Sequence, residues 1–139
     1  KPEVNYSPAT VVLAEYLNDH FADTIQVPGP FKGGQPMKPA TRYPSRGRML
    51  IREEQTPRRW LISEKPFREW LSKRQLSLKQ MLKELQEAGV LRSPRPRLAT
   101  LGAGTDVGGG QVMCIDVNGL HPTMSGVPMD VVELKRDVG

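Results

Sequence analysis

The stretch that decides the fold is SEKPFREWLSKRQLSLKQMLKELQEAGVL, residues 63–91, because it encodes two short helices with a break between them. The first helix has a serine at its start and is predicted to run to about Lys73. Ser77 and Gln80 have the spacing of a capping box, so a second helix is predicted to begin there and to end at Gly89. Two helices joined by a short turn are typical of a helix-turn-helix unit.

Strand patterns flank this helix pair on both sides. Before it, residues 48–53 and 58–63 alternate in apolar character and are predicted to form a β-hairpin around residues 54–57. After it, residues 91–100 and 111–117 are predicted strands with a flexible glycine-rich tip between them. A helix pair followed by such a hairpin is the order of a winged helix, in which the hairpin is called the wing.

The N-terminal part is predicted to add one helix and a long loop. A helix is expected over residues 8–22, because apolar residues recur at steps of three and four: Ala9, Val12, Leu13, Tyr16, Leu17 and Phe21. Residues 24–27 are a candidate short strand, and prolines and glycines make residues 28–46 a loop. An ordered loop is preferred to a disordered linker, because one amphipathic helix has no core of its own.

Together these elements predict an α+β fold, a winged helix-turn-helix with an additional N-terminal helix and β-hairpin. The length fits one domain over residues 1–139, with 118–139 as an extended C-terminal tail in which 131–134 are a candidate extra strand. No apolar run approaches the roughly 18 residues of a membrane span. The single cysteine, Cys114, lies among apolar residues and is interpreted as a buried structural thiol, so a cytoplasmic location is expected.

Positive charge is concentrated in the middle of the chain. The net charge is only +5, but residues 32–97 hold 17 Lys and Arg, eleven of them Arg, against six acidic residues. Both flanking segments are acidic overall. Such a concentration favours nucleic acid as the partner, because phosphate contacts release condensed counterions and the arginine fork suits phosphates and base edges. A solvated surface of ordinary charged helices is the alternative.

The predicted nucleic-acid-binding residues follow from the winged-helix interpretation. The second helix of the pair would enter the major groove, while the turn and the wing would contact phosphates. In the order helix, turn and wing these residues are Lys79, Lys83, Gln86, Lys73, Arg74, Arg92, Arg95 and Arg97. DNA is the favoured nucleic acid. The alternative function is a protein-docking or oligomerisation module without nucleic-acid binding, because winged helices also serve in that role.

Other candidate sites have structural explanations. Trp60 and Trp70 could stack on unpaired bases, but they lie in apolar contexts that favour core packing. The glycines of residues 102–110 invite comparison with a phosphate-binding loop, yet neither the lysine nor the helix that such a loop needs follows them. His20 and His121 lie far apart in the sequence, and no residues have metal-ligand spacing. The expectation is therefore a protein without a catalytic site, metal or cofactor.

Five segments carry a further similarity: LAEYLN (13–18), TIQV (24–27), RWLIS (59–63), LQEAGVL (85–91) and LGAGT (101–105). They resemble the C-terminal portion of phage and mobile-element replication proteins, which are primase-helicase-type ATPases. The resemblance implies a tail domain that helps a replication ATPase engage DNA, or that docks another replication protein. No Walker or primase motif is present in the sequence, so any ATPase or primase activity is expected in an upstream part.

Overall fold

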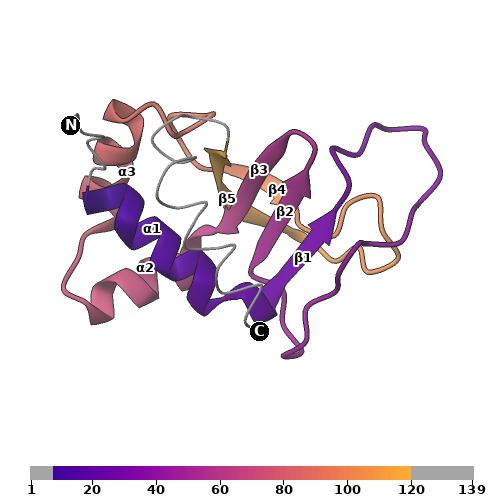
Figure 1. The fold of residues 1–139 in the computed structure, drawn as a ribbon, viewed down its shortest axis with the longest axis horizontal. Helices are drawn as coiled ribbons and strands as arrows, with labels where there is room; N and C mark the ends of the chain where they lie inside the picture. The colour runs from indigo at the N-terminus through magenta and orange to yellow at the C-terminus, as the bar shows by residue number, and fades with distance from the viewer. Residues whose placement is uncertain (1–7, 120–139) are drawn as a thin grey trace, which may run out of the picture.

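A computed structural model describes residues 8–119 of the chain as a mixed α+β fold (Figure 1). In chain order the elements are α1 (Pro8–Asp19), the 3₁₀ turn η1 (Phe21–Asp23), β1 (Thr24–Val27), β2 (Ile51–Gln55), β3 (Arg58–Ser63), α2 (Glu64–Lys73), α3 (Leu78–Glu87), β4 (Arg97–Thr100) and β5 (Gln111–Asn118). The predicted α+β class is therefore confirmed. The candidate strand at 131–134 and almost all of the predicted tail lie outside the described residues.

Element boundaries differ from the predictions at three places. α1 ends at Asp19 rather than at residue 22, because the chain then tightens into η1. β2 begins at Ile51, three residues later than predicted, and continues into the predicted turn. Of the predicted strand 91–100, only β4 is formed, because Pro94 and Pro96 lack the N–H group that a strand ladder needs.

The strands form one mixed sheet in the order β1-β2-β3-β5-β4. β2 and β3 are the predicted hairpin, with Glu53 opposite Trp60. β4 pairs antiparallel with β5, as expected for the second hairpin, and β3 pairs antiparallel with β5 to join the two hairpins. β1 pairs in parallel with β2, a long-range contact that the sequence did not indicate.

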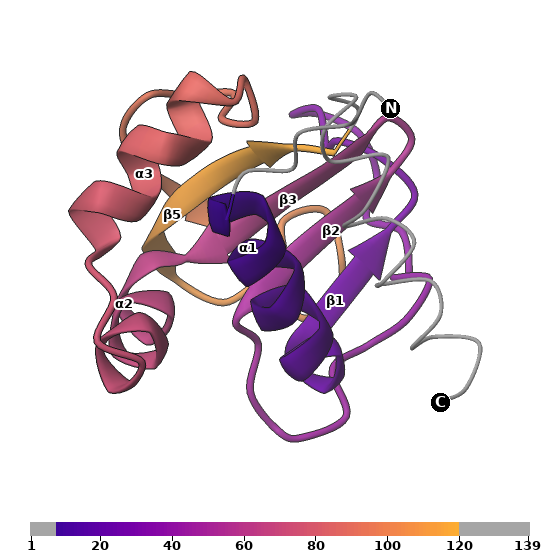
Figure 2. The same cartoon turned by 60° about the vertical axis from the view of Figure 1, so that its left-hand side comes forward.

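All three of the α-helices described cover one face of the sheet (Figure 2). Their apolar stripes enclose side chains of β3 and β5, and the largest of these is Trp60, which is 1% exposed. Tyr16 of α1, Phe67 of α2 and Leu85 of α3 are all fully buried in this core. Removal of so much apolar surface from water is the main stabilising contribution to the fold. The core interpretation of Trp60 is confirmed, while Trp70 is only partly buried against the same core.

The opposite face of the sheet is covered by residues 101–110, here called the glycine loop. Leu61 and Cys114 pack with Leu101 in a small second core. The guanidinium of Arg52 donates hydrogen bonds to the carbonyls of Leu101 (2.8 Å) and Ala103 (2.7 Å). Burial raises the pKa of the Cys114 thiol to about 11, as expected of a structural cysteine. The first half of the glycine loop, residues 101–105, thus packs against the sheet, whereas most of residues 106–110, at the predicted wing tip, are exposed.

Residues 28–46, here called the proline loop, lie against the glycine loop. The backbone N–H of Lys38 donates to the carbonyl of Gly104 at 2.8 Å. The Tyr43 hydroxyl donates to the carboxylate of Asp106 at 2.6 Å. The proline loop is therefore tied to a segment more than sixty residues away in sequence.

Candidate nucleic-acid interface

α2 and α3 present the predicted recognition residues on their outward sides. α3 begins after Ser77, whose hydroxyl accepts the backbone N–H of Gln80 at 3.3 Å, as an N-cap does. Gly89 follows the helix with φ 76°, a left-handed conformation that glycine adopts readily. The inward side of α3 buries Leu78, Met81 and Leu85.

Three exposed residues share the outward side of α3. Lys79, Lys83 and Gln86 follow one another at steps of four and three residues, which places them on one side of a helix. Lys73 is exposed in the last turn of α2, just before the connection to α3. Within residues 8–119, none of these three lysines has an ion-pair partner. The structure thus brings Lys73, Lys79, Lys83 and Gln86 together on one helix pair.

Arg74 ties α2 to α1. Its guanidinium lies over the Trp70 ring, 3.6 Å from the ring centroid. One of its terminal nitrogens is 3.6 Å from the carboxylate of Asp19 in α1. The Trp70 ring also meets Tyr16 edge to face, with the ring centroids 5.1 Å apart. Arg74 was predicted as a nucleic-acid contact, but in the structure it joins two helices.

Asp116 of β5 is the centre of a group of arginines. Arg59 donates two hydrogen bonds to the Asp116 carboxylate, at 2.8 and 2.7 Å, and Arg97 donates a third at 3.2 Å. The Nε atom of Arg92 lies 3.9 Å from the same carboxylate. Burial alone would raise the pKa of Asp116, but the hydrogen bonds and charges of Arg59 and Arg97 outweigh burial and hold this pKa below its usual value of 3.8.

The Asp116 group lies on the other side of the sheet from α2 and α3. In the register, Asp116 is opposite Leu61, which packs with the glycine loop, whereas the neighbouring Trp60 packs under the helices. Since alternate residues of a strand point to opposite faces, Asp116 and its arginines face away from the helix pair. The predicted wing residues Arg92 and Arg97 are therefore separated from the α3 lysines.

Arg95 differs from the other two predicted wing arginines. It is exposed in the connection between α3 and β4. It has no ion pair within the part of the chain that the structure describes. Among the predicted wing residues, Arg95 is thus the one whose charge is not shared with Asp116.

Most of the central arginines are engaged within the molecule. Of the eleven arginines in residues 32–97, nine form ion pairs with carboxylates. Arg42 donates to the carbonyl of Phe21 at 3.0 Å. Arg52 and Arg59 both bind Glu54, whose side chain is 5% exposed. The high arginine content, from which phosphate binding was predicted, is thus largely explained by ion pairs within the protein.

The sequence interpretation missed the carboxylates that organise these arginines. Asp116 and Glu54 entered it only as negative charges, although both are almost fully buried. One signal was present, because Asp116 interrupts the apolar run of β5, and a lone acid in an apolar strand needs a partner. The cavity between the proline loop and the glycine loop was also missed, since neither loop has a periodic pattern of side chains.

No family model, curated protein or solved structure matches the chain. Within residues 8–119, no three His, Cys, Asp or Glu side chains are grouped so as to hold a metal ion. No helix in that range combines the length and the apolar character that crossing a membrane requires. Functional inference therefore depends on the geometry and charge of the interface itself.

Proposed function

We propose that this chain is a DNA-binding module of winged-helix type that contacts DNA through α3. The observation that carries the proposal is the outward side of α3, where Lys79, Lys83 and Gln86 are exposed and neither lysine has an ion pair in residues 8–119. Such a lysine can exchange its counterion for a phosphate without first breaking an internal ion pair. Gln86 adds an amide that can read a base edge in the major groove.

The order and pairing of the elements support the winged-helix interpretation. A winged helix has the order helix, strand, two helices and two strands, and its last strand lies between the other two. The same order is found here in α1, β3, α2, α3, β4 and β5. In the sheet, β5 lies between β3 and β4. β1, β2 and the proline loop are then an insertion between α1 and β3. On this basis α2 and α3 are the helix-turn-helix and α3 is the recognition helix.

The two groups of basic residues contribute unequally in this proposal. Arg95 and Lys73 join the α3 lysines as phosphate contacts, because their charges are exposed and unpaired within residues 8–119. Arg92 and Arg97 contribute less, since the Asp116 carboxylate already binds them. The glycine loop makes no contact in this arrangement because it packs on the sheet.

The proposal is tested by titrating labelled duplex and single-stranded DNA by fluorescence anisotropy at about 50 and 200 mM salt. Affinity should fall as salt rises, because bound phosphates release their counterions. The triple variant Lys79→Ala, Lys83→Ala, Arg95→Ala should bind more weakly and should reduce the slope of log K against log salt by up to about 3. Preference for the duplex is expected if α3 enters a groove.

The matched control removes the same charge elsewhere. Lys32→Ala, Lys38→Ala, Lys65→Ala changes three exposed lysines that lie outside α3. Because Lys32 and Lys38 line the cavity between the two loops, this control is measured on duplex DNA only, where affinity and salt dependence should stay at their wild-type values. Binding that is indifferent to salt and to the α3 substitutions would contradict the proposal.

A place in a phage or mobile-element replication protein is a second part of the proposal, and it rests on the resemblance of the five segments. These segments lie in α1, β1, β3, the end of α3 and the start of the glycine loop. In such a protein, deletion of the module should lower ATPase activity that depends on DNA and leave the activity without DNA unchanged. Equal loss of both activities would argue against this role.

Protein docking is the second candidate function, favoured by apolar side chains on β4 and β5. Leu98 and Met113 lie opposite each other in the register and are 55% and 42% exposed. Among the strands of residues 8–119, β4 also lies at an edge of the sheet, and an edge strand can pair with a strand of another chain. Light scattering should show a dimer that Leu98→Ser returns to a monomer if this function is correct. A monomer that binds DNA favours the first proposal.

A further inference from the structure

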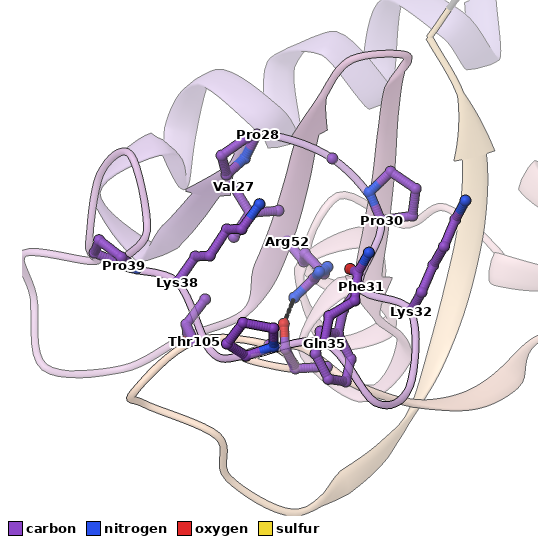
Figure 3. A pocket seen from close by; sticks show the side chains of 14 residues that line it. Val27, Pro28, Pro30, Phe31, Lys32, Gln35, Lys38, Pro39, Arg52 and Thr105 are labelled. Atoms are coloured by element: carbon purple, nitrogen blue, oxygen red, sulfur yellow. Dashed lines mark hydrogen bonds between the residues drawn. The ribbon is translucent and has the colours of Figure 1, made fainter.

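A cavity of about 380 Å³ lies between the proline loop and the glycine loop (Figure 3). The apolar part of its lining consists of Val27, Phe31 and four prolines, and the polar part includes Lys32, Gln35, Lys38 and Arg52. Residues 103–105 of the glycine loop line it as well. This volume is at the lower end of the roughly 300–1,000 Å³ found for small-molecule sites. The cavity therefore suits one compact ligand.

The lining carries positive charge, and none of the described residues that form it is acidic. In Figure 3, Lys32 and Lys38 stand on opposite sides of the view with Arg52 between them. Both lysines are exposed and lack an ion pair within residues 8–119, whereas Arg52 binds Glu54 at 3.0 Å. The two lysines are thus the free cations of the site and favour a ligand with a negative group.

Phe31 gives the cavity an exposed aromatic surface. Its side chain packs directly on Gly104, where an added Cβ would lie only 2.6 Å from the Cδ1 atom of the ring. Even so, Phe31 remains 41% exposed. The proline rings beside it lack N–H donors, so these walls offer apolar contact rather than hydrogen bonds. A flat ring is the ligand part that matches such walls.

Backbone hydrogen bonds hold the cavity in shape without a ligand. The proline loop is fixed at one end by the N–H of Thr56, which donates to the carbonyl of Pro28 at 3.0 Å, and further on by the bond from Lys38 to Gly104. Arg52 fixes the carbonyl of Ala103 on the other wall. Because these contacts already order both loops, binding costs less conformational entropy.

We propose that this cavity binds one nucleotide unit, with its phosphate at one of the two lysines, Lys32 or Lys38, and its base against Phe31. The phosphate is an anion, as the lysines favour, and the base is a flat ring that can pack against Phe31. Stacking on an aromatic side chain beside a basic contact is the common way of holding a nucleotide without sequence preference. The nucleotide is either free or an unpaired unit of a strand. The site lies apart from α3 and does not depend on the duplex binding proposed above.

Two binding measurements test the proposed nucleotide site. One is calorimetric titration with adenosine 5′-monophosphate, adenosine and inorganic phosphate, and the other is fluorescence anisotropy with labelled oligothymidine. The double variant Lys32→Ala, Lys38→Ala should weaken nucleotide binding by about tenfold, because a phosphate contact is lost. The single variant Phe31→Ala should weaken it by a similar factor, because base stacking is lost. The matched control Lys79→Ala, Lys83→Ala removes the same charge from α3 and should leave binding of the monophosphate unchanged. Circular dichroism of each variant checks that the fold is retained.

The two sources of the nucleotide give different results. Loss of monophosphate binding in the cavity variants shows that a free nucleotide suffices, and loss of oligothymidine binding alone shows that the unit comes from a strand. Either result supports the proposal. It is overturned if neither probe responds to the cavity variants, if the α3 control lowers monophosphate binding equally, or if inorganic phosphate binds as well as the monophosphate. Duplex binding through α3 would survive any of these failures.

Discussion

The Asp116 group and the outward side of α3 both carry several positive charges, but they hold them in opposite ways. At Asp116, three arginines converge on one carboxylate whose side chain is 4% exposed, and Arg59 binds it through two nitrogens. On α3, the lysines extend into solvent without an ion pair in residues 8–119. The planar arginine fork suits a fixed carboxylate, whereas lysine is a flexible point charge. Charge at the first region thus serves the fold, and charge at the second is available to a partner.

The largest effect is expected from Asp116→Ala. Removing the carboxylate leaves Arg59, whose side chain is 13% exposed, without its main partner. Loss of one partner of a buried ion pair costs about 3 to 5 kcal/mol, so the free energy of unfolding in urea should fall by roughly that amount. Glu87→Ala at an exposed position of α3 is the control and should change stability by less than about 0.5 kcal/mol. A small loss in Asp116→Ala would show that the arginines at this group are as dispensable as surface charges.

A pH series sharpens the same comparison. The folded-state pKa of Asp116 lies below its ordinary value of 3.8, so the stability that its ionised form contributes is fully present above that value. This contribution is lost as pH falls through the lower folded-state pKa. The difference in unfolding free energy between wild type and Asp116→Asn should therefore be constant near neutral pH and shrink below about 3.8. A difference that shrinks already between pH 7 and 5 would point to another titrating group.

A smaller effect is expected from Arg74→Ala, which combines features of both regions. Arg74 is partly exposed, yet it stacks on Trp70 and pairs with Asp19. A cation–π contact at an exposed site and a surface ion pair are each worth up to about 1 kcal/mol, so the loss should be near 1 kcal/mol. Arg74→Lys should lose less, because it keeps the charge. If Arg74→Ala changed DNA affinity but not stability, Arg74 would belong with the α3 lysines.

The smallest effect on stability is expected from Lys79→Gln, Lys83→Gln. Neither side chain has an ion pair in the described part of the chain, so the unfolding free energy should stay within about 0.5 kcal/mol of wild type. The same double variant should weaken duplex DNA binding more than Arg92→Ala, Arg97→Ala, although both remove two charges. Equal weakening by the two variants would remove the distinction between paired and unpaired cations.

The helices and hairpins were predictable because their signals are local. The apolar stripe of α1, the serine cap of α3 and the alternation in β3 each follow from a few neighbouring residues. The parallel pairing of β1 with β2 was not predictable, since it joins residues on either side of a long loop that has no pattern of its own. The path of the glycine loop was missed for a similar reason, because it is fixed by Arg52, a residue about fifty positions away.

The candidate interface was predictable only where helical spacing decides exposure. The steps from Lys79 to Gln86 place these residues opposite the buried stripe of α3, as the structure shows. Arg92 and Arg97 have no such period, and nothing local in the sequence indicates that Asp116 binds them. Which charges meet across a sheet is decided by strand order and register, and these depend on the whole chain.

The parallel pairing of β1 with β2 has a consequence for how the chain can be divided. α1 and β1 connect to the remaining elements through the exposed proline loop, but Leu13 and Tyr16 are fully buried in the core that all three helices share. A cut within residues 32–37 would sever the backbone without disturbing that core. The two pieces, produced separately, should therefore associate and re-form the sheet. This loop is thus a suitable place to split the protein into two self-assembling fragments.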